Sequence, residues 1–207
     1  MTNLSKLNRE RLEQEMIFEQ GNVQAEMSAT DGTQKLLLAW PDSLKRATSL
    51  LPIVNNAATQ RTTECVMIPN PERKTACVSS QVGCAMGCGF CETAQMGLLR
   101  NLTAGEIVAQ WFAARHRIEN TFDGGRGFLI KNIVFMGMGE PTENLDAVLH
   151  AVRIFTDHYG ASIASSNITI STVGRVAGIE KIAEFARQTG FHRLHLALSL
   201  NAPNDAI

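Results

Sequence analysis

A regular alternation of strand-length and helix-length apolar patterns fills residues 76–207 and limits the folds open to this chain. Short apolar runs typical of strands alternate with segments whose apolar residues recur at helical spacing. In chain order, the runs and segments are 76–79, 103–118, 129–136, 145–155, 167–171, 179–185 and 194–200. This β-α-β-α-β-α-β order predicts an α/β core, in which parallel strands form a sheet with helices packed outside it.

The first part of the chain, residues 1–75, lacks this alternation. Its opening is rich in Glu, Gln and Asn and favours a loosely attached helix within 1–30, around an apolar cluster at 16–18. The turn signal Asp31-Gly32-Thr33 precedes apolar runs that predict strands at 35–40 and 62–68. We therefore expect an N-terminal helix and a β-rich lead-in before the core.

Composition and hydropathy narrow the class of protein. Lys and Arg number 19 against 20 for Asp and Glu, a net charge of −1, so binding to nucleic acid by bulk charge alone is not expected. No run of about 18 apolar residues is present to span a membrane, and the polar segment 1–20 lacks the apolar region of a signal peptide. We expect a cytoplasmic protein with reduced thiols, in which clustered cysteines serve metal binding or catalysis.

Three cysteines lie close together in the run Cys84-Ala-Met-Gly-Cys88-Gly-Phe-Cys91. Three thiolates so close together can bind three irons of a cubane cluster, leaving the fourth iron open to a small chelating ligand. The alternative is a structural zinc site with Cys77 as the fourth ligand, although such sites usually consist of two separated C-x2-C pairs. The compact spacing favours the cluster.

Two further residues bear on this site. Phe90 directly precedes the third cysteine, and an aromatic side chain there is compatible with shielding a cluster from water. Cys65 stands in the apolar strand expected at 62–68, where it is most simply a buried small hydrophobic residue. Cys65 is therefore not expected to be a metal ligand.

Glycine-rich or polar residues follow the later strands. The strand at 129–136 leads to Gly137-Met138-Gly139-Glu140-Pro141, and the next two end at Ser171 and at Ser199-Leu200-Asn201. In a barrel of parallel strands, the loops after the strands gather at one rim and carry the chemistry. Glu140 can accept from an ammonium group, and the hydroxyl and amide side chains can hydrogen-bond a ribose or a carboxylate. Alone, Gly-x-Gly-Glu-Pro is equally compatible with a plain turn and helix start.

Together these motifs resemble those of radical S-adenosylmethionine (SAM) enzymes, in particular the RlmN/Cfr family of RNA adenine methyltransferases. The three cysteines with Phe90 form the pattern of the radical SAM class. The run 68–84, the turn 137–141 and the segments 170–174 and 196–205 agree with the RlmN/Cfr branch, in the same order. The resemblance covers about residues 31–207. It implies a partial (βα)6 radical SAM barrel with about four βα units, preceded by a small β-rich N-terminal segment.

The resemblance assigns roles to individual residues. It implies that the open iron of a [4Fe-4S] cluster binds the amino and carboxylate groups of SAM, and that the cluster ligands are Cys84, Cys88 and Cys91. The residues implied to line the SAM site are Gly139, Glu140, Ser171, Ser199, Leu200 and Asn201. Glu64 falls where the family has its proton acceptor. Cys77 matches the cysteine that forms a transient disulfide with a methyl-carrying cysteine near the family's C-terminus.

The reaction implied by the resemblance consumes two SAM molecules. One methylates the distal cysteine, and the other is split to a 5′-deoxyadenosyl radical that takes a hydrogen atom from this methyl group. The carbon radical adds to carbon 2 of an adenine, and loss of a proton with disulfide formation releases the product. RlmN-type members act on 23S rRNA and on tRNA, whereas Cfr-type members modify carbon 8. The implied partners are RNA and an electron donor such as flavodoxin, with the protein a monomer.

The sequence also departs from the family pattern. No cysteine follows Cys91, only about four of six βα units are expected, and the leader before Glu64 is short. Asn201 stands where the family usually has His, and Glu92 where a small residue is common. We expect this chain to be a fragment, or half of a split protein, that is inactive alone. The alternatives are another radical SAM reaction and a non-catalytic cysteine-rich metal-binding module.

Overall fold

The computed structural model describes residues 4–15, 21–40, 61–70, 74–119, 130–202 and 204. The apolar cluster expected at 16–18 lies outside the described residues, as do Pro71 and Leu129. The helices are α1 (Lys6–Glu15), α2 (Glu92–Gln95), α3 (Ala104–Glu119), α4 (Leu145–Thr156) and α5 (Val176–Ala186), with 3-10 turns η3 (Pro141–Asn144) and η4 (Ser165–Asn167). The strands are β1 (Asn22–Ser28), β2 (Gln34–Ala39), β3 (Thr62–Ile68), β4 (Lys74–Cys77), β5 (Gln81–Gly83), β6 (Leu98–Asn101), β7 (Ile130–Phe135), β8 (Ile168–Thr172) and β9 (His195–Leu198).

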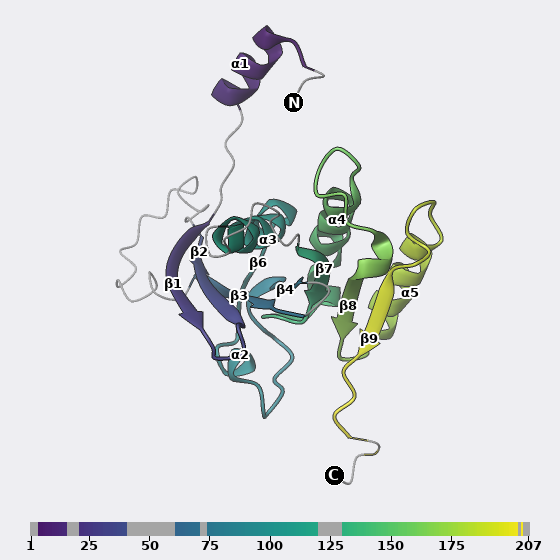
Figure 1. Ribbon diagram of the computed structural model, residues 1–207. Coiled ribbons are helices and arrows are strands. Elements are labelled where there is room, and N and C mark those ends of the chain that lie inside the picture. The colour runs from purple at the N-terminus through teal and green to yellow at the C-terminus, as the bar shows by residue number, and fades with distance from the viewer. Residues whose placement is uncertain are drawn as a thin grey trace, which may run out of the picture.

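A seven-stranded sheet forms the framework, in the order β1-β2-β3-β4-β7-β8-β9 (Figure 1). Strands β4, β7, β8 and β9 pair in parallel, which confirms the expected α/β core. Strands β1 to β4 pair antiparallel, so the lead-in extends the same sheet. The expected division of the chain at residue 75 stays a prediction. Strands from both sides of this residue belong to one sheet, so the sheet itself marks no boundary there.

The structure corrects the sequence prediction in two places. The helix expected within 1–30 occupies only α1, which has no buried residue and stands apart from the sheet in Figure 1, while 22–28 form strand β1. The second difference is a small ribbon of β5 and β6, inserted between β4 and α3 around the cysteine run. Strands β5 and β6 are too short to show a periodic apolar pattern. Strand β1 does alternate, with Val23, Ala25 and Met27 between polar residues, a pattern typical of a strand.

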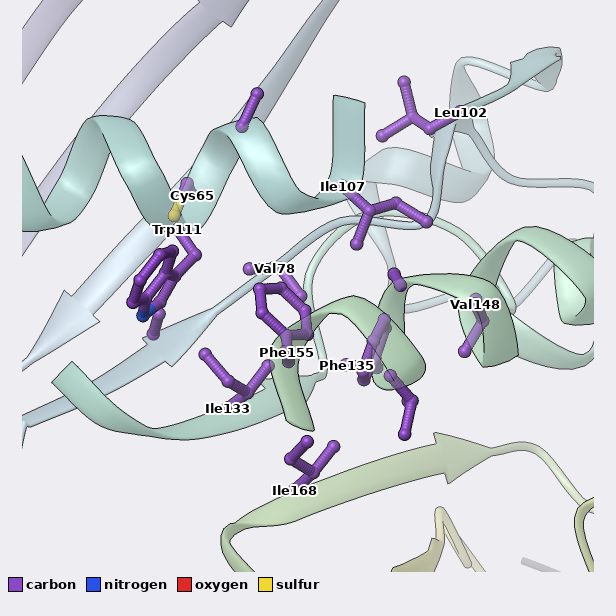
Figure 2. Close-up of a cluster of buried hydrophobic side chains, with 14 of the residues drawn as sticks. Cys65, Val78, Leu102, Ile107, Trp111, Ile133, Phe135, Val148, Phe155 and Ile168 are labelled. Atoms are coloured by element: carbon purple, nitrogen blue, oxygen red, sulfur yellow. The ribbon is translucent and has the colours of Figure 1, made fainter. Parts of the chain in front are cut away.

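Helices α3 and α4 pack on one face of the sheet and close the main core. Figure 2 shows Trp111 of α3 and Phe155 of α4 in this core with Ile133 of β7, and the two aromatic rings meet edge to face with centroids 6.0 Å apart. The Trp111 indole N–H also donates to the carbonyl of Ile130 over 3.1 Å. Cys65 is buried in the same core, as expected. No helix in the described part of the chain has the length and apolar character needed to cross a membrane.

The opposite face of the sheet carries the polar residues. In β8, Ile168, Ile170 and Thr172 are buried, whereas the alternating residues Thr169 and Ser171 are only partly covered. Because successive side chains in a strand point to opposite faces, the partly covered residues share the face away from α3 and α4. The carboxyl ends of the parallel strands on this face frame the candidate site.

Candidate functional site

A cavity of about 450 Å³ lies at the carboxyl ends of the parallel strands. Eight of the residues expected at the metal and SAM sites line it: Cys84, Cys88, Cys91, Gly139, Glu140, Ser171, Ser199 and Asn201. They come from segments that are far apart in the sequence, namely the loop after β5 and the ends of β7, β8 and β9. The sheet therefore brings the cysteine run and the later strand ends to one place.

The cysteine loop is held by backbone hydrogen bonds at both ends. Cys84 follows β5 directly, and its N–H donates to the carbonyl of Gly97, while the N–H of Cys91 donates to the carbonyl of Cys88. Gly83 has φ +76°, and a Cβ there would lie 1.8 Å from the Gly97 oxygen, so the close approach of β5 to this loop requires glycine. Cys84 is buried, whereas Cys88 and Cys91 are partly exposed towards the cavity.

The donor set suits a cluster whose irons are bound by separate thiolates. Among the described side chains, no three of Cys, His, Asp or Glu are arranged to hold a metal ion, whereas a cubane needs one thiolate for each of three irons. Burial raises the pKa of the Cys84 thiol, and the neighbouring Cys88 charge adds to this shift. Bound iron would supply the positive charge that stabilises the thiolate. Cys77, the fourth ligand of the zinc alternative, is not among the cavity residues.

Two glycines let the turn after β7 approach the segment after β4. A Cβ on Gly137 would lie 2.7 Å from the Ser79 hydroxyl oxygen, and a Cβ on Gly139 would lie 2.5 Å from the Cβ of Gln81. Gly139 also has φ +95°, a backbone conformation that side chains disfavour. Both glycines of Gly-x-Gly-Glu-Pro are therefore required by close packing against Ser79 and Gln81.

Glu140 is buried and has a structural role in addition to lining the cavity. One carboxylate oxygen accepts from the Thr142 N–H over 3.1 Å, so Glu140 caps η3, with Pro141 at its start. The other oxygen accepts from the Val173 N–H over 3.0 Å. The helix-start interpretation is thus correct. It does not exclude a ligand, because the oxygen facing Val173 has a lone pair left.

The ends of β8 and β9 contribute hydroxyl groups. The side-chain oxygens of Ser171 and Ser199 lie 3.2 Å apart, and the Ser199 N–H donates to the carbonyl of Thr172. Asn201 lines the cavity beside them, whereas Leu200 is 73% exposed and is not a lining residue. Phe90 also lines the cavity, although it is largely exposed.

Glu64 and Cys77 lie near each other on the sheet but do not line the cavity. Val66 is the register partner of Cys77, and Glu64 lies two residues before Val66 on β3, so both side chains are on the same face. Glu64 forms a half-exposed ion pair with Lys35, with 3.0 Å between Oε1 and Nζ. Burial raises the pKa of the Cys77 thiol, while a backbone hydrogen bond from Met136 lowers it in part.

Four buried polar residues around this site were missed by sequence reasoning. They are Ser79, Gln81, Gln110 and Asn144. The Gln110 amide accepts from the Ser79 N–H over 2.8 Å and donates to the Ser79 carbonyl over 2.9 Å. A glutamine on a predicted amphipathic helix gives no signal of such a contact. The Ser-Ser-Gln run before Cys84 belongs to the family run 68–84 and has no pattern of its own that predicts these contacts.

Known proteins resemble this chain in sequence and in fold. No family model matches the chain. The dual-specificity RNA methyltransferase RlmN of Halorhodospira halophila is 41% identical over 207 residues, which cover 100% of this chain and 49% of that protein. The probable dual-specificity RNA methyltransferase RlmN 1 of Protochlamydia amoebophila is 49% identical over 142 residues, 69% of this chain and 36% of that protein. A crystal structure of a radical SAM methyltransferase from Sphaerobacter thermophilus matches with a TM-score of 0.75 and 38% identity, over 99% of this chain and 52% of that chain.

The chain shares its fold with a protein of the radical SAM methyltransferase class. Within that class, the chain belongs to the RlmN family. It spans about half the length of the relatives that match it from end to end. The recognised resemblance and the α/β fold class are therefore confirmed.

Proposed function

We propose that this chain is the cofactor-binding part of an RNA methyltransferase that methylates carbon 2 of an adenosine in 23S rRNA, tRNA or both. The observation that carries the proposal is the meeting of the three cysteines with the Gly137–Glu140 turn at one cavity. The 41% identity to an RlmN protein over the whole chain supports the substrate class. The activity belongs to the longer family protein, of which this chain spans about half.

In this proposal Cys84, Cys88 and Cys91 hold a [4Fe-4S] cluster. When bound, the cluster supplies one electron to the sulfonium of SAM. The pairing of β5 with β6 fixes both ends of the cluster loop, and the three cysteines line the cavity.

The remaining cavity residues bind and orient SAM. Glu140 accepts from the ammonium group through the oxygen that faces Val173, since its other oxygen already accepts from the Thr142 N–H and hydroxyl. Ser171, Ser199 and Asn201 offer hydrogen-bonding groups to the ribose and carboxylate. Leu200 is assigned to the SAM site by the family resemblance alone, since it is exposed and is not among the residues that line the cavity.

Glu64 and Cys77 act on the nucleic-acid substrate. Glu64 takes the proton that leaves carbon 2, and its ion pair with Lys35 holds its carboxylate on the face of the sheet that also carries Cys77. Cys77 forms the disulfide that releases the product, with a cysteine of the family protein outside this chain. An electron donor such as flavodoxin, a monomeric state and a cytoplasmic location complete the proposal.

The test joins this chain to the part of the Halorhodospira halophila relative that it does not span. The fusion, loaded with iron and sulfide and reduced, should produce 2-methyladenosine in 23S rRNA or tRNA, measured by mass spectrometry of nucleosides. The chain alone should produce none, and a fusion with Cys77→Ala should accumulate a protein–RNA adduct. Production of 8-methyladenosine, or of free product by the Cys77→Ala fusion, would contradict the proposal.

A further inference from the structure

The segment Ser79–Gln81, between β4 and β5, is buried and makes polar contacts with several elements. The Ser79 hydroxyl donates to the carbonyl of Glu64 over 2.7 Å and accepts from the Met138 N–H over 2.9 Å. The N–H groups of Ser80 and Gln81 both donate to the Met138 carbonyl. The segment therefore joins β3 to the turn after β7.

Gln81 has the most direct contact with the proposed SAM site. Its side-chain oxygen accepts from the Glu140 N–H over 2.9 Å, and its amide nitrogen donates to the Asn101 side chain over 2.7 Å. Gln81 is fully buried, and Gly139 rests on its side chain so closely that a Cβ would not fit. Both polar ends of the amide are thus satisfied, and one of them fixes the backbone of Glu140.

We propose that Gln81 is a positioning residue that fixes the Glu140 carboxylate for the ammonium group of SAM. The inference rests on the proposed function, because it takes SAM as the ligand. Gln81 begins β5, the strand that leads directly into Cys84. One side chain therefore ties the position of the cluster loop to the position of the carboxylate that binds the same cofactor.

The physical reason is the cost of an unsatisfied buried donor. Without the Gln81 oxygen, the Glu140 N–H has no partner in the described structure, and such a group is costly to bury. The turn then relaxes, and the Glu140 carboxylate moves relative to the cysteine loop. The rest of the cavity, formed by β8 and β9, keeps its own hydrogen bonds.

The test compares Gln81→Met, which keeps the length of the side chain, with Ser80→Ala as a matched control. Ser80 is the adjacent buried residue, and its hydroxyl has no hydrogen-bond partner within the described structure. Affinity is measured on the cluster-loaded chain for two ligands, SAM and 5′-methylthioadenosine, which lacks the amino-acid part. Amide hydrogen exchange of Glu140 is measured on the chain without cofactors.

We expect Gln81→Met to weaken SAM binding about tenfold, with unchanged 5′-methylthioadenosine binding, unchanged cluster absorbance and faster exchange at Glu140. Ser80→Ala should match the wild type in all four measurements. The inference would be overturned if Gln81→Met lost affinity for both ligands equally, or if it bound SAM with wild-type affinity. If the wild-type chain binds neither ligand, the proposed function fails. In that case, the rate of amide hydrogen exchange at Glu140 still tests the role of Gln81. A faster rate in Gln81→Met than in the wild type supports this role, and an unchanged rate overturns it.

Discussion

Glu140 combines two tasks at the scale of a single residue. Its carboxylate caps η3 by accepting from Thr142, and it accepts from Val173 at the start of the loop after β8. It also lines the cavity. A neutral amide of the same shape can accept at one of these positions only, because its NH2 group meets an N–H donor at the other. The carboxylate is therefore required by local structure, and its charge remains available to a cation.

Two variants together separate the two tasks. Glu140→Gln removes a charge-assisted hydrogen bond to the SAM ammonium worth about 1.5–3 kcal/mol, so affinity should fall about ten- to a hundredfold, measured by titration of the cluster-loaded chain. Thr142→Val is the control, because it removes a hydroxyl contact to Glu140 and keeps the charge. If both variants lose stability alike and neither loses affinity, Glu140 is only a cap.

At the scale of elements, the start of α3 shows how much of the local structure could be predicted from the sequence. Thr103 and Glu106 have the spacing of a capping box, and both of its hydrogen bonds are present: the Glu106 N–H donates to the Thr103 hydroxyl, and the Thr103 N–H donates to the Glu106 carboxylate. The sequence did not indicate that Arg100 forms a two-pronged pair with Glu106, at 2.7 and 2.9 Å. Arg100 belongs to β6, whose short sequence has no periodic signal.

The same contrast holds for the other elements. Strand β3 was predicted at its observed bounds, because its alternate residues are apolar and buried. The prediction of a helix within 1–30 included no strand at β1, which alternates at Val23, Ala25 and Met27, is largely exposed and pairs with β2. Gln81 and Gln110 act through contacts across the fold, which no local pattern encodes.

The Glu106 pair gives a pH-dependent prediction for the stability of α3. Burial alone would raise the pKa of Glu106, but hydrogen bonds from Arg100 and Thr103 lower it below its ordinary value of 4.5. The stabilisation is therefore complete above about pH 4.5 and is lost as the pH falls through the lower, folded pKa. Glu106→Gln should cost about 2–3 kcal/mol at pH 7 and progressively less in acid, measured by urea unfolding.

A control for this prediction is available on the surface. Glu10→Gln alters an exposed ion pair with Lys6 within α1, and it should change the free energy of unfolding by well under about 1 kcal/mol. An equal effect of the two substitutions at pH 7, or a Glu106→Gln penalty that does not shrink in acid, would show that the Arg100 pair does not stabilise the fold.

At the scale of the whole molecule, one sheet carries both parts of the proposed chemistry. Its parallel strands bring the cofactor residues to their carboxyl ends, and its antiparallel extension brings Glu64 beside Cys77. The match of 99% of this chain to a radical SAM methyltransferase structure shows that this fold is shared. The central question is therefore whether the cavity binds a [4Fe-4S] cluster and SAM.

The most direct measurement is the iron and sulfide content of the chain after anaerobic reconstitution, together with its visible spectrum before and after addition of SAM. We expect a brown protein with about four irons per chain and a spectrum that changes when SAM is added. Iron should be lost in Cys84→Ala, Cys88→Ala and Cys91→Ala and fully retained in Cys65→Ala. A colourless protein that binds zinc instead, or a Cys65→Ala variant that loses iron as readily as Cys88→Ala, would contradict it.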